Sequence, residues 1–403
     1  MTSSLAAGVA RGTGAWRRFA VKRSTDRILT THTGSLPRPP ALLEVFTGDR
    51  QVDAGEFARL THEAVDQIVR DQDQAGVDVV NDGEMSKESY STYVRERLSG
   101  FEGESEAVLN LADLSAYPSF MARWASIWGT QSGEVLSPPA CVADIAVKDR
   151  SLLQADIDNL KAAVGDTPPE DVFMSAASPG VVGAFFANHH YANHEDYLRA
   201  IGAAMREEYE AIVAAGFVLQ LDCPDLAMCR HLQFQHLSIE EFRAEARMHI
   251  EVLNEATAGI DPDQMRLHLC WGNYEGPHHH DVPLRDIVDI VLDGRPNAIA
   301  LEAANPRHAH EWQVFEDVKL PDGKALIPGV IDSTMNYIEH PELIAQRLVN
   351  YGRLVGRENV LAGSDCGFGT AARVSYVDPQ ITWAKFAAMT EGARLATSEL
   401  TRT

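Results

Sequence analysis

The stretch Met265-Arg-Leu-His-Leu-Cys-Trp271 is a short apolar run that stops abruptly at Gly272-Asn273. In a β-strand, successive side chains point to opposite faces of the sheet. His268 and Cys270 would then project to one face, and the apolar residues between and beside them to the other. The run therefore predicts a strand whose end presents an imidazole and a thiol side by side.

Seven further runs of this kind follow one another along the chain, each ending near Gly, Asp, Ser or Pro. Together with 266–270, they cover residues 28–32, 77–81, 172–176, 218–222, 298–302, 325–331 and 360–365. The segments between them carry apolar residues at helical spacing, such as Leu198, Ile201, Met205 and Tyr209. Eight strands alternating with helices predict an α/β protein with a (β/α)8 TIM barrel.

The pattern also predicts how the chain is divided. Residues 27–400 are expected to form a single catalytic barrel. Residues 1–26 are basic, lack the apolar stretch of a secretory signal, and are expected to form a disordered N-terminal extension. The segment from about 100 to 150 is too long for an ordinary connection and is expected to be an insertion after the second strand.

The amino-acid composition indicates which kinds of binding partner and which cellular location are favoured. The 403 residues carry a formal net charge of -23, which disfavours nucleic acid and anionic membranes and favours a small-molecule substrate. No apolar run reaches the roughly 18 residues of a membrane-spanning helix. The five cysteines are widely spread and form no CxxC pair, which favours a reducing, cytoplasmic location over a disulfide framework. A homo-oligomer is compatible with these observations.

Metal-binding residue types collect at the carboxyl ends of the predicted strands, where barrel active sites lie. They are His268, Cys270, Glu302 and Cys366. Each could instead be an ordinary core residue, because buried cysteines often behave as small hydrophobes. Their joint occurrence favours a metal site, and thiolate and imidazole ligands favour Zn²⁺. Since the ligands come from separate strands, a catalytic site with Glu302 as the exchangeable ligand is expected.

Other motifs are less specific. The run His278-His279-His280-Asp281 is typical of a solvated loop, with a proton donor near the site as the alternative, and His189 has the same ambiguity. The sequence contains no Walker loop, no GxGxxG after a strand and no GxSxG elbow. Nucleotide chemistry and serine hydrolysis therefore have no support.

Several segments, in order, resemble the catalytic barrel of cobalamin-independent methionine synthase. They are THTGSLPRP, VVNDGEMSKESY, LQLDCPDLAM, LHLCWGN, IALEAANPRH, PGVID and GSDCGFGT. The resemblance covers roughly residues 27–395 and looks strongest to the short, single-barrel relatives, which include epoxyalkane:coenzyme M transferases. The duplicated N-terminal barrel of the long enzymes is absent, and loops 185–191 and 272–281 do not match the segments associated with polyglutamylated folate.

The resemblance implies roles for individual residues. His268, Cys270 and Cys366 would bind zinc, with Glu302 as the fourth and most replaceable ligand. The amine and carboxylate of a homocysteine-like thiol would be held by the residues that match the family's substrate-binding positions, which are Gly34, Ser35, Glu84 and Asp222.

The leading hypothesis is a zinc-dependent thiol S-alkyltransferase that joins a small thiol to a small alkyl donor, either a methyl compound or an epoxide. The candidate proton donors are His189, His278 and Asp332. A sulfonate thiol such as coenzyme M would need a cation in the pocket, and the candidates are Arg38, Lys87 and Arg307. The alternatives are a metal-free barrel lyase of the porphyrinogen decarboxylase type and a non-catalytic metal-binding relative.

Overall fold

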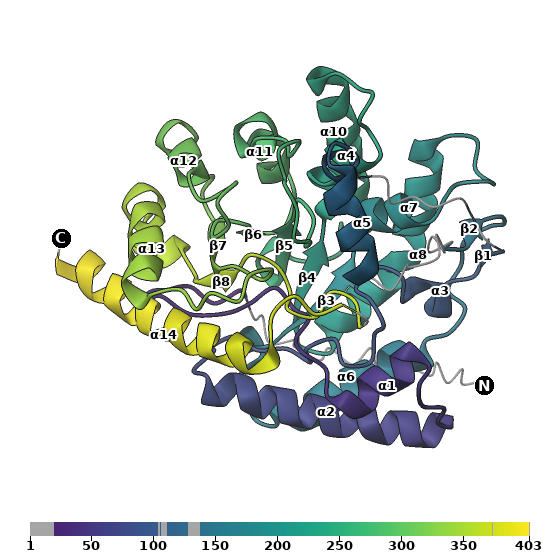
Figure 1. The fold of residues 1–403 in the computed structure, drawn as a ribbon, viewed down its shortest axis with the longest axis horizontal. Coiled ribbons are helices and arrows are strands. Elements are labelled where there is room, and N and C mark those ends of the chain that lie inside the picture. Colours follow the sequence, from purple (N-terminus) through teal and green to yellow (C-terminus); the bar gives the residue numbers. More distant parts are fainter. Residues whose placement is uncertain (1–19, 104, 106–110, 128–137, 373, 403) are drawn as a thin grey trace, which may run out of the picture.

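The computed structural model describes residues 20–403 apart from 104, 106–110, 128–137, 373 and 403. Its centre is a curled sheet of six parallel strands in the order in which they follow along the chain (Figure 1). The strands are β3 (Phe173–Ala177), β4 (Val218–Asp222), β5 (Met265–Leu269), β6 (Ala298–Leu301), β7 (Ala325–Ile331) and β8 (Gly363–Ser364). All of their residues are buried, which is expected of parallel strands covered by helices.

The two earliest predicted strands are present only as single bridges. Thr30 pairs with Ala362 and Val80 with Val172, both in parallel, and the amides of Asp78 and Val79 donate to the carbonyl of Thr30. The prediction of eight strands is thus confirmed for six. Side chains compete for the backbone of the other two: the Thr30 amide, for example, donates to the Asp78 carboxylate at 2.9 Å. With these bridges, the curled sheet is consistent with a TIM-like barrel.

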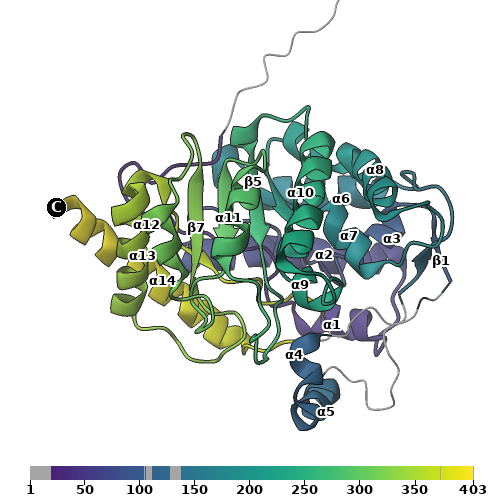
Figure 2. The same cartoon turned by 90° about the horizontal axis from the view of Figure 1, so that it is seen from above.

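Helices pack around the outside of the sheet (Figures 1 and 2). The longer ones are α1 (Pro40–Thr47), α2 (Ala54–Gln74), α5 (Pro118–Ile127), α6 (Ser151–Val164), α8 (His194–Ala214), α10 (Ile239–Ala256), α11 (Leu284–Leu292), α13 (Pro341–Val355) and α14 (Pro379–Arg402). The shorter ones are α3 (Val94–Arg97), α4 (Ala112–Ser115), α7 (Pro179–Phe185), α9 (Cys229–Leu232) and α12 (Val314–Asp317). Single 3-10 turns lie at Pro169–Asp171, Pro224–Leu226, Pro262–Gln264, Glu311–Gln313 and Arg357–Asn359.

The predicted insertion contains a small antiparallel pair, β1 (Phe101–Glu102) with β2 (Ala140–Cys141), and helices α4 and α5 lie between these two strands in the sequence. Figure 2 shows α4 and α5 projecting from the body of the molecule. Leu111 and Leu114 anchor α4 on Met228, Leu232 and Tyr274, which belong to the loops after β4 and β5. Because parts of the segment lie outside the described residues, its status as an insertion stays a prediction.

The chain just before the predicted barrel boundary lies across the amino ends of the strands. The Val21 amide donates to the Asp263 carbonyl, Lys22 forms an ion pair with Asp171 at 2.6 Å, and the Ser24 hydroxyl donates to the Val360 carbonyl. The expected disorder of 1–19 falls outside the described residues, and the boundary at residue 27 stays a prediction. Among the helices described, none is long and apolar enough to cross a membrane.

Candidate metal and substrate site

Three predicted metal ligands come together at the carboxyl ends of the strands. His268 belongs to β5, Cys270 is the first residue after the end of β5, and Cys366 lies two residues after the end of β8. The Sγ atoms of the two cysteines are 2.9 Å apart, and Cys366 Sγ is 3.5 Å from His268 Nε2. All three side chains are buried. Their ligand atoms lie within 4.8 Å of one another, so they can share one ion.

Asp222 at the end of β4 orients the imidazole. Its Oδ1 lies 3.3 Å from His268 Nδ1 and also accepts a hydrogen bond from Gln220. Because a carboxylate accepts, Nδ1 would carry the proton, and this leaves Nε2, which lies 3.5 Å from Cys366 Sγ and 3.4 Å from the Asp365 carbonyl oxygen, available to a metal ion. A carboxylate behind a ligating histidine is the usual outer-shell arrangement in metal sites.

Burial raises the pKa of the Cys366 thiol well above its ordinary value, and the adjacent Cys270 thiol and Glu302 raise it further. Two thiolates could not coexist at this distance in a dry environment without a cation between them. The Cys270 sulfur accepts one further contact, from the Gly272 amide at 3.2 Å. The pair is therefore suited to a soft metal ion.

Glu302 lies beside the cluster but is held by other groups. Its Oε1 accepts from the Trp271 amide at 2.8 Å, and its Oε2 accepts from the Asn305 side chain at 2.7 Å. Burial and the Cys270 sulfur raise its pKa well above the ordinary value. The structure does not bring Glu302 into the group of three close ligand atoms, so its role as fourth ligand stays a prediction.

A pocket opens beside the three ligands. It is lined by Thr33, Ser35, Glu84, Tyr90, Asp222, Pro224, His268, Cys270, Asn273, Cys366, Gly367 and Thr370. The predicted substrate residues Ser35, Glu84 and Asp222 are among them. Gly34 lies directly behind, where a Cβ atom would be 2.8 Å from Glu84 Oε1 and the φ of +144° favours glycine.

The Glu84 carboxylate is only half satisfied. Its Oε1 accepts from the Ser175 hydroxyl at 2.6 Å, whereas its Oε2 is buried and has no hydrogen-bond partner in the described part of the chain. Burial raises the Glu84 pKa; nearby Lys87 lowers it and Asp222 raises it. Its φ of 59° is unusual for a residue other than glycine. Because buried acceptors are normally hydrogen-bonded, the unpaired Oε2 of Glu84 is a candidate acceptor for a hydrogen-bond donor on a ligand.

No arginine or lysine lines the pocket among the residues that the structure describes. Arg38 donates instead to the carbonyls of Gly369, Glu84 and Lys87. The Lys87 ammonium donates to the Ser175 carbonyl and lies 4.5 Å from the centre of the Tyr93 ring. Arg307 is exposed and does not line the pocket. The pocket is therefore anionic.

The three candidate proton donors do not line this pocket. His189 is exposed and its amide donates to the Cys141 carbonyl beside β2. Asp332 is buried, and its Oδ1 accepts from the amide and hydroxyl of Thr334. His278 lies in a separate polar network. Their roles as proton donors therefore stay predictions.

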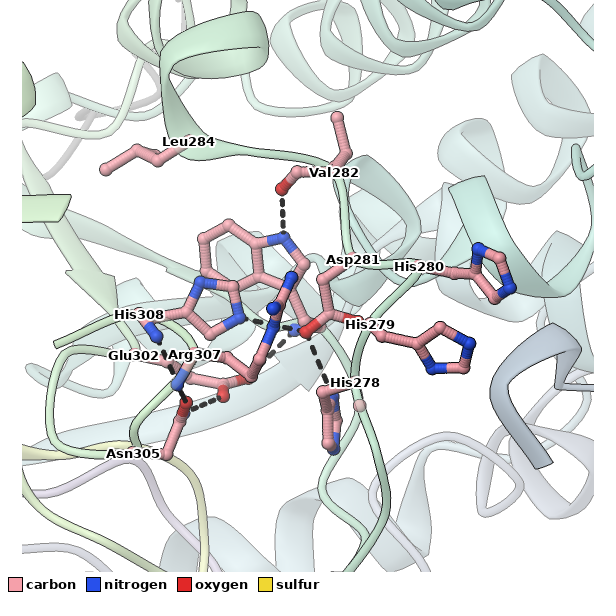
Figure 3. A network of polar contacts seen from close by, with 12 residues as sticks. His278, His279, His280, Asp281, Val282, Leu284, Glu302, Asn305, Arg307 and His308 are labelled. Atoms are coloured by element: carbon pink, nitrogen blue, oxygen red, sulfur yellow. Dashed lines mark hydrogen bonds and ion pairs between the residues drawn. The ribbon is translucent and has the colours of Figure 1, made fainter. Parts of the chain in front are cut away.

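That network centres on Asp281, which accepts hydrogen bonds from His278 Nδ1 at 3.0 Å and from His308 Nε2 at 2.9 Å (Figure 3). Burial lowers the pKa of each histidine, but the hydrogen bond and charge of Asp281 outweigh it at His278 and raise its pKa to about 9. At His308, hydrogen bonds to Asp281 and Glu311 and the charges of Glu302 and Glu311 outweigh burial and raise the pKa to about 10. The His308 ring stacks on Trp271 at 4.0 Å. The network thus packs against Trp271, two residues after the end of β5, and helps to hold this segment in place.

Six of the residues that line the pocket were given no role by sequence reasoning, namely Thr33, Tyr90, Pro224, Asn273, Gly367 and Thr370. Asn273 had a usable signal, since it follows the end of the β5 run directly. Its side-chain amide donates to the Gly367 carbonyl and its oxygen accepts from Ser333, so it links the loops after β5, β7 and β8. Tyr90 and Thr370 lie in loops whose approach to the site no local pattern reveals.

The protein has an α/β fold whose curled parallel sheet is consistent with a TIM-like barrel. The carboxyl edge of this sheet carries two thiols, an imidazole and two buried acids, which together form a candidate metal and substrate site. The family model described as "Cobalamin-independent synthase, Catalytic domain" matches residues 186–390, about half of the chain. The chain belongs to this family, as the resemblance of its motifs implied.

Individual relatives can be aligned with this chain over almost its whole length. The methionine synthase of Saccharolobus solfataricus is 23% identical over 378 residues, covering 93% of this chain and 96% of the relative. That of Thermococcus kodakarensis is 22% identical over 376 residues, covering 93% and 94%. A B12-independent methionine synthase from Shewanella sp. W3-18-1, solved in complex with selenomethionine, has a TM-score of 0.70 at 19% identity and covers 94% of this chain and 100% of that one.

Proposed function

We propose that this protein is a zinc-dependent thiol S-methyltransferase whose acceptor is an amine-bearing thiol of the homocysteine type. The observation that carries the proposal is a pocket with two buried acids and, among its described lining residues, no cation, directly beside two thiols and an imidazole. Curated relatives are named methionine synthases, and a structural neighbour holds selenomethionine, the selenium analogue of a methylated homocysteine.

The donor set suits zinc, which prefers thiolate and imidazole ligands. A tetrahedral zinc ion with ordinary bond lengths places a nitrogen and a sulfur ligand about 3.6 Å apart, close to the 3.5 Å between His268 and Cys366. It would place two sulfurs about 3.8 Å apart, so Cys270 and Cys366 would have to spread from 2.9 Å. When bound, zinc lowers the pKa of a substrate thiol and so keeps its sulfur nucleophilic.

The residues of the chain would hold and orient the acceptor. The unpaired Oε2 of Glu84 would accept a hydrogen bond from a substrate ammonium, and Asp222 would add a second negative charge on the same wall. Methyl transfer then forms a carbon–sulfur bond and breaks the bond between the methyl carbon and the donor, whose electron pair leaves with the donor. The buried walls exclude water, which would compete for the methyl group.

The same pocket disfavours the other hypotheses. A sulfonate thiol such as coenzyme M would meet Glu84 and Asp222 in a pocket whose described lining offers it no cation to contact, which also weakens the case for an epoxide:coenzyme M transferase. A lyase that grips several carboxylates would need arginines in the pocket lining, and the described lining has none.

The test is calorimetric binding to the zinc-loaded full chain, because it does not require the methyl donor to be known. Homocysteine, desamino-homocysteine and coenzyme M are titrated in parallel. We expect homocysteine to bind at least about tenfold more tightly than desamino-homocysteine, as one charge-assisted hydrogen bond is worth about 1.5–3 kcal/mol. Equal binding of the two, or preference for coenzyme M, would reject the proposal.

A further inference from the structure

A second cluster of metal-ligating side chains lies between α8 and α10, outside the site described above. It consists of His194 at the start of α8 and of Glu245 and His249, which share one face of α10 as residues four apart. The two helices pack against each other. We propose that these three residues bind a second divalent transition-metal ion, independently of the proposed function.

The geometry suits an ion held by two imidazoles and a carboxylate. His194 Nε2 and His249 Nε2 face each other at 3.2 Å, and all three ligand atoms lie within 4.8 Å of one another. Two nitrogens on a tetrahedral zinc ion are separated by about 3.3 Å at ordinary bond lengths. The two rings therefore already stand close to where a shared ion would hold them.

An outer shell fixes the inner ring. His249 Nδ1 donates to Asp225 Oδ2 at 2.8 Å, and Asp225 Oδ1 accepts from the Ser178 hydroxyl at 2.6 Å. With its proton on Nδ1, His249 presents the lone pair of Nε2 to His194. Gly180 makes room for this pair, because a Cβ atom there would lie 2.0 Å from Asp225 Oδ2. Such carboxylate–histidine pairs typically orient metal ligands.

Two neighbouring residues, Phe234 and Glu245, indicate that His194 and His249 form more than a simple hydrogen-bonded pair of histidines. Phe234 contacts both rings at about 6 Å between ring centres and shields one side. Glu245 is half-buried, and its carboxylate has no hydrogen bond or ion pair within the described part of the chain. A hydrogen bond between two neutral imidazoles does not require a carboxylate beside it, whereas the negative charge of a carboxylate favours binding of a divalent ion. Nitrogen and oxygen donors favour zinc, cobalt or nickel over calcium or magnesium.

The site would act on the loop after β4. Asp225 is three residues beyond Asp222, which orients His268, and both lie in the segment that ends this strand. An ion at His194 and His249 would tie α8 and α10 to this loop, with one coordination position left for water.

The experiment is binding of Co²⁺ and Zn²⁺ to the full chain, measured as ions per chain after dialysis together with the cobalt absorption spectrum. We expect His194→Ala to bind one ion fewer than wild type while keeping thiolate-to-cobalt charge-transfer absorption. Cys270→Ser should also lose one ion, but with loss of that absorption. Equal stoichiometry for wild type and a folded His194→Ala variant would overturn the proposal.

Glu245→Gln provides the finer test, since it leaves the two imidazoles and their hydrogen bond in place. The affinity for the second ion should fall at least about tenfold, as expected for loss of an anionic ligand. Glu251→Gln, an exposed residue of the same helix, is the matched control and should leave it unchanged. Equal affinity in Glu245→Gln and Glu251→Gln would show that the carboxylate is no ligand and overturn the three-residue site.

Discussion

Glu84 is the residue on which substrate choice depends. Its Oε2 is buried in the pocket wall without a partner, and the backbone at this residue has a positive φ. Both features cost free energy in the empty protein, and a bound ammonium would offset the first.

Glu84→Gln should therefore weaken homocysteine binding about 10- to 100-fold, because a neutral amide replaces a charged acceptor. Binding of desamino-homocysteine should change little, which makes this ligand the internal control in the same calorimetric titration. A loss of the same size for both thiols would indicate a general disturbance of the pocket rather than amine recognition.

Asp222 has a different task, because it lies behind His268 as well as on the pocket wall. Asp222→Asn should lower zinc affinity about 10- to 100-fold, as is usual when the carboxylate behind a ligating histidine is lost. Competition with a chromogenic chelator measures this affinity, and the unfolding midpoint of the metal-free protein shows whether the fold is intact. Unchanged zinc affinity in a folded variant would remove Asp222 from the metal site.

At the scale of elements, the loops after β8 and before α1 meet where the pocket is formed. The Phe368 amide donates to the Ser35 carbonyl at 2.8 Å, and a Cβ atom on Gly367 would lie 2.0 Å from Ser35 Oγ. Gly367→Ala should push these loops apart and lower activity, through kcat and KM together. Gly103→Ala, where nothing lies within 4 Å of the added Cβ atom, is the control for a glycine substitution outside the pocket and should leave the kinetics unchanged.

The loop after β5 depends on Asp281. The pKa values of His278 and His308 are raised to about 9 and about 10, so their stabilisation is complete below the unfolded value of about 6.5 and is lost as pH rises through 9–10. The Asp281 pKa is lowered to about 2: burial raises it, but its histidine partners lower it more, so its own contribution is lost only as pH falls towards 2.

Asp281→Asn should accordingly destabilise the fold by about 3–5 kcal/mol between pH 4 and 6.5, because it removes the counter-charge of His278 and one of the two carboxylates bonded to the buried His308, the other being Glu311. Denaturant unfolding of both proteins across the pH range measures the difference, which should shrink as pH approaches 10. A difference that does not vary with pH would mean that the network is not ionised as described.

The elements also show how much the sequence can predict. The apolar runs at 218–222 and 325–331 coincide with β4 and β7, since burial on both faces leaves a continuous apolar pattern. The runs at 28–32 and 77–81 form only bridges, because side chains such as Asp78 occupy backbone groups, which hydrophobicity cannot reveal. The histidine run was ambiguous for a similar reason: nothing local indicates that Asp281 is buried between His278 and His308.

At the scale of the whole molecule, residues from β4, β5 and β8 that lie far apart in the sequence converge on one edge of a curled sheet. The rule that barrel sites lie at the carboxyl ends of strands was sufficient to group His268, Cys270 and Cys366. It could not place Glu302, because loop hydrogen bonds to Trp271 and Asn305 decide where that carboxylate points.

The central claim is that this edge binds zinc through thiolates. The most direct measurement is the zinc content after dialysis of two proteins, His194→Ala and the double variant His194→Ala/Cys270→Ser, so that the cluster of His194, Glu245 and His249 does not contribute and the two proteins differ only at the thiol site. We predict about one zinc per chain in the first and none in the second. No zinc in the first, or equal zinc in both, would contradict the account.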